Sequence, residues 1–294
     1  MNNLYQLTLG NNKLSEGLTA SGFLGIPNGS SLSLYLNNNG FTSLPTGIFD
    51  HRTALQTLNL SNNQFSGGLG GVLSHMTTIN QLYLDNNQLT AVPADIASLA
   101  NLTNLSLNNN QITSVANVPT SVHTLSLNNN QFTSIPSDIG LLTNLQTLHL
   151  SDNRISERSG APLSGNANLS YLYLQNNQLT EIPLDIRSGA TNLRYLYLDS
   201  NRISELPVGI FSGNMGAITQ INLQQNRLHD LPSDVATYPI NVDLQINCFG
   251  TRDSSPAAVT YLETRYGSSR ESNQYLCLKD FTYSPAKPLS GTVA

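Results

Sequence analysis

Large apolar residues recur along most of this 294-residue chain with one spacing, and polar residues fill the positions between them. In the stretch LQTLNLSNNQF over residues 55–65, Leu58 and Leu60 alternate with polar residues at positions 57, 59 and 61. This period of two predicts a short strand that is buried on one face only. Leu55 and Phe65 flank the strand, and we expect both to lie inside the same turn of chain.

The same frame, LxxLxLxxNxL or a close variant, occurs eleven times. Its asparagines are Asn12, Asn39, Asn63, Asn87, Asn110, Asn130, Asn153, Asn177, Asn201, Asn226 and Asn247. Neighbouring asparagines are 20 residues (Asn110 to Asn130) to 27 residues (Asn12 to Asn39) apart. A repeat of this length predicts a solenoid in which each turn adds one strand. Each asparagine stands where the chain leaves the strand, so we expect a structural role, with the amide binding buried backbone groups of the bend.

The return segments between strands also share a motif. In six of these segments a proline is followed, two residues later, by aspartate or glycine. The prolines are Pro45, Pro93, Pro136, Pro183, Pro207 and Pro232. Proline fixes φ and the aspartate or glycine eases a turn, so we expect short helical or 3₁₀ segments on the convex side. Residues 66–71 and 156–165 lack the motif and predict looser loops. The 20-residue repeat from Asn110 to Asn130 leaves too little chain for a helix and predicts an extended segment.

The phrase LPTGIFDHRTALQTLNLSNNQ at residues 44–64 resembles the typical class of extracellular leucine-rich repeats, about 24 residues long. That class includes the variable lymphocyte receptors of jawless vertebrates, Toll-like receptors and small proteoglycans. The resemblance covers residues 4–247 or so. It implies an α/β fold: a right-handed, curved leucine-rich-repeat solenoid with a concave parallel β-sheet and short convex helices or 3₁₀ turns. We assign residues 1–247 to this solenoid.

Both cysteines of the chain, Cys248 and Cys277, follow the last repeat. We expect a disulfide that closes a C-terminal cap over residues 248–281, with a helix near 256–266; the alternative is a pair of buried thiols. The receptors named above end in a four-cysteine module, whereas similar two-cysteine endings occur in simpler leucine-rich-repeat proteins. A disulfide favours an oxidising compartment and therefore the outside of the cell or its surface. Residues 282–294 predict a flexible tail or linker.

The charge content narrows the possible partners. Charged residues make up 11% of the chain and the net charge is −5, which argues against binding nucleic acid or an anionic membrane. No apolar run reaches the length of about 18 residues that crosses a bilayer, so direct membrane insertion is not expected. The first residues enter a repeat at once, with no charged and apolar leader. A signal segment is thus absent from this sequence, and the protein is either cytosolic or a mature form.

The residues between the strand leucines face outward, and almost all are neutral and polar. Two adjacent repeats differ from this neutral, polar pattern and carry tyrosines at the outward positions: Tyr171, Tyr173, Tyr195 and Tyr197. Neighbouring strands lie about 4.8 Å apart, so we expect the four rings to touch. The candidate partner-binding set is Tyr171, Tyr173, Tyr195, Tyr197, His149, Arg194, Asp199, Tyr83 and Tyr35. Exposed aromatics rimmed by a few charges are typical of protein-binding surfaces, although tyrosine also simply favours strands.

A second array stands three residues after the repeat asparagines: Thr42, Ser66, Thr90, Thr113, Thr133, Ser156, Thr180 and Ser204. Periodic hydroxyl groups suit a crystalline surface such as ice, or a polysaccharide, but they are also ordinary repeat consensus. No motif for a catalytic nucleophile, a phosphate loop or a metal site occurs, so we expect no enzyme, no cofactor and no metal. Protein recognition on the concave face is the leading hypothesis. Binding of a neutral glycan or cell-wall polysaccharide comes second, and a structural or ice-binding role third.

Overall fold

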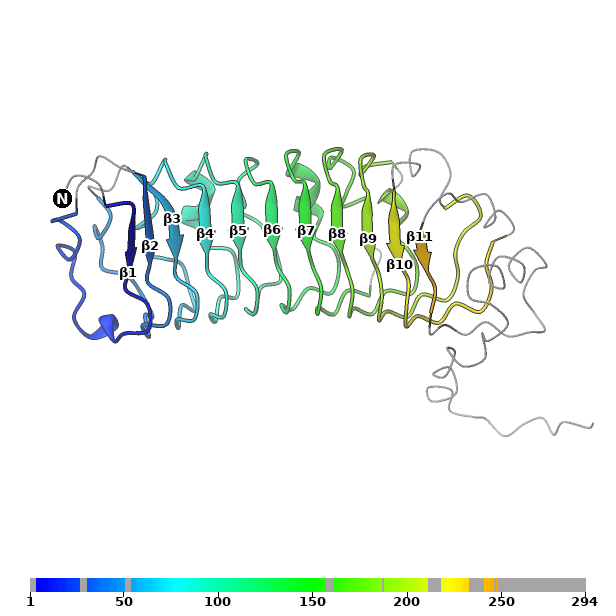
Figure 1. Cartoon of the computed structure of the whole chain (residues 1–294), viewed down its shortest axis with the longest axis horizontal. Coiled ribbons are helices and arrows are strands. Elements are labelled where there is room, and N and C mark those ends of the chain that lie inside the picture. Colours follow the sequence, from blue (N-terminus) through cyan, green and yellow to red (C-terminus); the bar gives the residue numbers. More distant parts are fainter. Residues whose placement is uncertain are drawn as a thin grey trace, which may run out of the picture.

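The computed structural model describes residues 4–26, 31–50, 54–156, 161–186, 188–210, 218–232, 241–245 and 247. Within them, eleven short strands form one parallel sheet whose strand order follows the sequence (Figure 1). The strands are β1 (Gln6–Thr8), β2 (Leu32–Tyr35), β3 (Leu55–Asn59), β4 (Gln81–Tyr83), β5 (Asn104–Ser106), β6 (Thr124–Ser126), β7 (Thr147–His149), β8 (Tyr171–Tyr173), β9 (Tyr195–Tyr197), β10 (Gln220–Asn222) and β11 (Asn241–Asp243). The predicted solenoid with a parallel sheet is confirmed.

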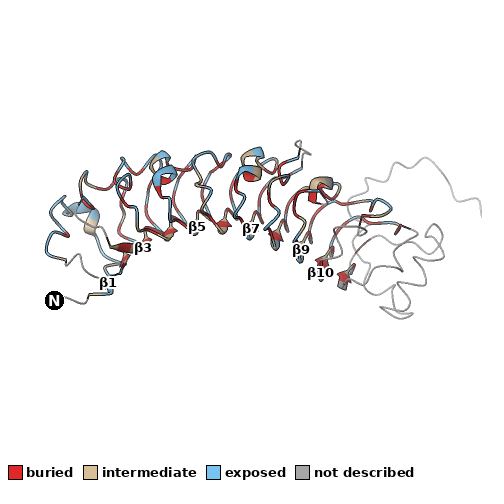
Figure 2. Ribbon diagram, turned by 90° about the horizontal axis from the view of Figure 1, so that it is seen from above, coloured by how far each residue is buried: buried red, intermediate tan, exposed pale blue. Residues whose placement is uncertain are grey.

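The solenoid is curved, and the strands line the inner, concave side of the arch (Figure 2). The return segments carry the 3₁₀ helices η1 (Leu14–Glu16), η2 (Ala94–Ser98), η3 (Ser137–Leu141) and η4 (Leu184–Ile186). Paired strands approach to about 4.8 Å, while helical and irregular segments need more room between turns. The sheet therefore forms the shorter, inner side of the arch.

The convex helices follow the proline motif only in part. The helices η2, η3 and η4 each begin near a proline whose second neighbour is aspartate. After Pro45 and Pro207 the second neighbour is glycine, and the chain forms turns. Gly47 and Gly209 have φ of +78° and +72°, whereas a 3₁₀ helix needs φ near −60°. The segment after Pro232 lies outside the described residues. In the 20-residue repeat, residues 113–123 contain no helix, as predicted.

The core runs along the whole described solenoid and consists of the inward leucines and their neighbours. Leu58 and Leu60 are fully buried, and each repeat contributes equivalent residues to one continuous cluster. Phe41 and Phe65 stack inside adjacent turns with ring centroids 6.5 Å apart. Since each turn buries its leucines against the next, the strands stay in register along the sheet.

Ten of the eleven repeat asparagines are buried and hydrogen-bonded to the backbone of two turns. Asn12 in the first repeat is exposed, and its amide donates to the Leu9 and Gly10 carbonyl oxygens of its own turn, both at 3.0 Å. For Asn63, Nδ2 donates to the carbonyl oxygens of Leu60 at 2.9 Å and, in the preceding turn, of Leu36 at 3.1 Å. Its Oδ1 accepts the backbone N–H groups of Asn39 and Phe41, both at 3.0 Å. The bond to a preceding-turn carbonyl recurs at Asn39, Asn87, Asn110, Asn130, Asn153, Asn177, Asn201, Asn226 and Asn247. These amides tie adjacent turns together where the chain leaves the sheet.

The residue before each repeat asparagine from Asn12 to Asn226 adopts a left-handed backbone, with φ between +52° and +60°. The set is Asn11, Asn38, Asn62, Asn86, Asn109, Asn129, Asp152, Asn176, Ser200 and Gln225. Asparagine and aspartate tolerate this region better than other residues with a Cβ. Their preference for it explains why the asparagines of the repeat come in pairs.

Replacing Ser200 by asparagine should raise the free energy of unfolding by about 0.5–1 kcal/mol, because its φ of +56° favours asparagine. The Ser200 hydroxyl already donates to Gln225 Oε1 at 2.6 Å along this column, and an asparagine amide can make an equivalent bond, as Asn38 Nδ2 does to Asn11 Oδ1 at 2.8 Å. Urea unfolding of both proteins measures the difference. The reverse change, Asn62→Ser, should lower stability by a similar amount; a less stable Ser200→Asn protein would contradict the explanation.

Several expectations lie outside the described residues. These are the pairing of Cys248 with Cys277, the cap over 248–281 with its helix near 256–266, and the tail over 282–294. Among the helices that the structure does describe, none has the length and apolar character needed to cross a bilayer.

Candidate functional site

The concave face is built by the outward residues of the strands. A strand alternates its side chains between two faces, so the residues flanking each inward leucine project into the concave space. The register places equivalent residues side by side: Thr147, Tyr171 and Tyr195 form one row, and His149, Tyr173 and Tyr197 form the next. Aromatic side chains from adjacent repeats therefore meet on β7, β8 and β9.

Five of these rings stack in two rows. Tyr171 and Tyr195 have ring centroids 4.7 Å apart and ring planes within 4° of each other. Tyr173 and Tyr197 are 4.8 Å apart with planes within 2°, and His149 stacks on Tyr173 at 4.3 Å. We call these five residues the aromatic block. Because the rings stack along the solenoid, each presents its edge, and each tyrosine its hydroxyl group, to the concave space.

The aromatic block is accessible but only partly so. Tyr171 is 38% exposed, and the other four residues are half-buried. Burial raises the pKa of Tyr173, and the neighbouring Tyr197 and Tyr171 raise it further. Burial lowers the pKa of His149 from its usual value of 6.5. At neutral pH Tyr173 and His149 are therefore uncharged. The phenol groups of the block can both donate and accept hydrogen bonds.

Charges lie at both ends of the block. Arg194 directly precedes β9 and is exposed, whereas Asp199 follows the same strand at its other end and is half-buried. Burial is the main cause that raises the pKa of Asp199; a hydrogen bond from its own backbone N–H lowers it, and the carboxylates of Asp152 and Asp243 raise it. The block thus has a basic side chain at the amino end of β9 and an acidic one at the carboxyl end.

The two remaining candidates lie apart from the block. Tyr35 is on β2 and Tyr83 on β4, with Asn59 of β3 between them in register. Burial raises the pKa of Tyr83, and the electrostatic influence of Tyr35 and Asp85 raises it further. The phenol groups of Tyr35 and Tyr83 therefore interact electrostatically across β3. The strands β5 and β6 separate Tyr83 from the block.

The sequence did not single out Ser151 and Gln175, which follow β7 and β8 next to the block. Both carry a buried oxygen, Oγ of Ser151 and Oε1 of Gln175, that has no hydrogen-bond partner in the part of the chain that the structure describes. Their composition alone gives no signal, because most residues in this column are neutral and polar.

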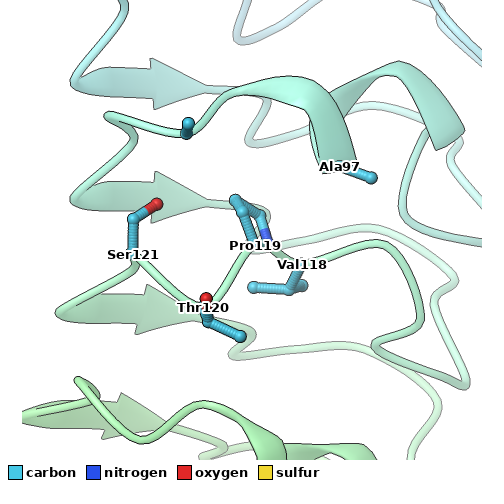
Figure 3. A pocket seen from close by; sticks show the side chains of 6 residues that line it. Ala97, Val118, Pro119, Thr120 and Ser121 are labelled. Carbon is cyan, nitrogen blue, oxygen red and sulfur yellow. The ribbon is translucent and has the colours of Figure 1, made fainter.

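Among the described residues, the convex side and the flank of the solenoid carry fewer accessible aromatic side chains than the concave face. On the convex side, the short repeat leaves a hollow beside η2 lined by Ala97, Ala100, Val118, Pro119, Thr120 and Ser121 (Figure 3). Its side chains are small, and none is charged. On the flank below the strands, seven members of the hydroxyl array are exposed and Ser204 is half-buried. The described residues include no group of three or more His, Cys, Asp or Glu side chains that could hold a metal ion.

The chain resembles known families in sequence and in structure. Residues 30–89, 120–179 and 191–237 match the model described as leucine rich repeat, and residues 167–208 match a model of two such copies. No curated protein matches the chain.

Three solved structures illustrate the likeness. A chain of the Toll–Spatzle complex from Drosophila has 26% identity and a TM-score of 0.68, over 83% of this chain and 34% of its own length. An internalin (inlF) from Listeria monocytogenes has 26% identity and a TM-score of 0.58, over 76% of this chain and 67% of its own. A chain of the octameric complex of Latrophilin 3, Unc5D and FLRT2 has a TM-score of 0.74 at 21% identity, over 90% and 82%, which concerns the fold alone.

Proposed function

The chain belongs to the leucine-rich repeat family, and we propose that it is a non-enzymatic recognition module that binds a protein partner on the concave face of its sheet. The observation that carries this proposal is the aromatic block, five stacked rings from three adjacent strands in an otherwise polar face. Tyrosines held rigid by stacking lose little conformational entropy on binding, which is why they are common in protein interfaces.

The comparisons support a protein partner. The matching chain of the Toll–Spatzle complex, 26% identical to this one, comes from an assembly of two proteins, although this chain spans only 34% of it. We also propose an extracellular or cell-surface location, which rests on the expected Cys248–Cys277 bridge and on the resemblance to extracellular repeats.

A neutral glycan is the second candidate, but the block suits it less. Sugar rings usually pack on an open aromatic face, whereas here tyrosine faces are covered by the next ring at 4.7 and 4.8 Å. The exposed hydroxyl array on the flank remains the feature that favours a structural or ice-binding role as a third candidate.

The test is a double substitution, Tyr173→Ala with Tyr197→Ala. Partners are first recovered from cell-surface extracts by crosslinking to the unmodified protein, and their affinity is then measured by surface plasmon resonance. If both rings are hot spots, affinity should fall by about 100-fold or more. A double variant on the flank, Thr90→Ala with Thr133→Ala, is the matched control and should bind normally. Unchanged affinity of the tyrosine variant would remove the block as the site, and binding on a glycan array alone would favour the second candidate.

A further inference from the structure

Three polar side chains follow the strands of the aromatic block in adjacent register: Ser151 after β7, Gln175 after β8 and Asp199 after β9. Backbone hydrogen bonds of 3.0 Å, from Asp152 N to the Gln175 oxygen and from Asn176 N to the Asp199 oxygen, hold these turns side by side. The three residues therefore form one row along the edge of the block, with neighbouring members about 4.8 Å apart.

This row begins where a ladder of side-chain acceptors stops. Asp85 Oδ1 accepts the backbone N–H of Asn108 at 2.8 Å, Asn108 Oδ1 accepts that of Asn128 at 2.8 Å, and Asn128 Oδ1 accepts that of Ser151 at 2.9 Å. The short side chain of Ser151 cannot continue the pattern to the next turn. Its Oγ and the Oε1 of Gln175 are buried without a hydrogen-bond partner.

Unpaired buried oxygens are uncommon because each costs stability, so two of them side by side call for an explanation. Ser151 is only 3% exposed, whereas Gln175 is half-buried, so its amide can turn toward the concave space. Asp199 completes the row with a half-buried carboxylate, which can accept hydrogen bonds from a ligand. Each of the three groups can accept a hydrogen bond, and no donor from the described residues reaches Ser151 Oγ or Gln175 Oε1.

The charges of the surrounding face point to the same kind of ligand. On the described outward positions of the sheet and the residues just after it, the charged side chains are the carboxylates of Asp85, Asp199 and Asp243. Asp85 accepts the hydroxyl of Ser106, and Asp243 accepts the amide of Gln224, both at 2.5 Å, so the fold already uses them. Asp199 is the carboxylate left for a ligand.

Taking the proposed protein-binding function as given, we propose that Ser151, Gln175 and Asp199 bind the guanidinium group of an arginine in the partner, beside the aromatic block. A guanidinium group is planar and has five N–H donors, and a carboxylate accepts two of them side by side. The remaining donors point toward Gln175 Oε1 and Ser151 Oγ. The adjacent tyrosine edges and hydroxyls bind the extended stem and backbone of the same segment.

The probe is the peptide acetyl-Gly-Arg-Gly-amide, compared with the same peptide carrying citrulline, which has the same shape but no charge. Nuclear magnetic resonance follows the side-chain amide of Gln175 and the ring protons of Tyr197 as each peptide is added. The arginine peptide should bind about tenfold more tightly than the citrulline peptide. Asp199→Asn should remove this preference, whereas Asp138→Asn, which removes an equal charge on η3, should preserve it.

A second variant separates binding from folding. Ser151→Ala removes an unpaired hydroxyl, so the thermal unfolding midpoint should stay the same or rise while the arginine peptide binds more weakly. A lower midpoint would show that the hydroxyl serves the fold.

Equal binding of both peptides, or an arginine preference that survives in Asp199→Asn, would overturn the inference. If the arginine preference fails while the Tyr173→Ala/Tyr197→Ala protein still loses its partner, the proposed function stands without this site; the opposite result leaves a cation site without the proposed interface.

Discussion

Replacing Asn130 by alanine should lower the free energy of unfolding by about 2–4 kcal/mol. The Asn130 side chain donates to the carbonyl oxygens of Leu107, Leu127 and Asn128 and accepts the N–H of Ile112 at 2.9 Å. Most of the cost arises from the Ile112 N–H, which is left buried without this acceptor. The two leucine carbonyls each keep a second asparagine donor, which limits the loss.

The matched control is the next residue, Gln131→Ala. Gln131 is exposed, so its replacement should change stability by less than about 0.5 kcal/mol. Guanidinium unfolding followed by circular dichroism measures both variants. Since Asn130 lies in the middle of the solenoid, a second transition in its unfolding curve would show that the two halves have lost their coupling. A variant as stable as the parent would mean that the asparagine bonds contribute little to the fold.

Replacing Gly189 by alanine should cost about 3 kcal/mol or more, because the convex turns touch there through their backbones. A Cβ at this position would lie 1.9 Å from the carbonyl oxygen of Leu163 and 2.7 Å from the Cα of Ser164. No side chain can rotate away to relieve such an overlap, so the two return segments have to separate.

Gly67→Ala is the control for this effect, since a Cβ there meets nothing within 4 Å. It should fold with unchanged or slightly higher stability, because alanine restricts the unfolded chain more than glycine does. Thermal unfolding compares the two proteins, and hydrogen exchange at the amides of residues 163–166 reports local loosening. Normal exchange and stability in Gly189→Ala would show that the turns have more room than the structure indicates.

The fold could be predicted from the sequence because each repeat encodes the same turn. The leucine period fixed which face of each strand is buried, and the spacing of the asparagines gave the register. Tyr171 and Tyr195 stand in the same place of consecutive repeats, so their contact followed without knowledge of the structure. The return segments were less predictable: one residue, glycine in place of aspartate after the proline, replaces a 3₁₀ helix with a turn.

For the candidate site, the repeat spacing predicted which side chains are neighbours but not how each of them is hydrogen-bonded. His149 was expected to flank the tyrosines, and the structure stacks it directly on Tyr173. The unpaired oxygens of Ser151 and Gln175 could not be foreseen, because a sequence shows which groups accept hydrogen bonds but not which donors come within reach. Whether these two oxygens find a hydrogen-bond donor depends on the lengths of the neighbouring side chains in one row, and this is visible only in the structure.

The in-register stacking of identical turns has a consequence for how such a chain can evolve. Each aromatic row repeats at the strand spacing, and every turn is joined to its neighbours by the same backbone and asparagine bonds. A duplication of the gene segment for one repeat, such as that bearing Tyr195 and Tyr197, would add a further pair of rings together with the leucines and return segment that support them. The footprint on the partner would lengthen in steps of about 4.8 Å, so selection could adjust it one repeat at a time.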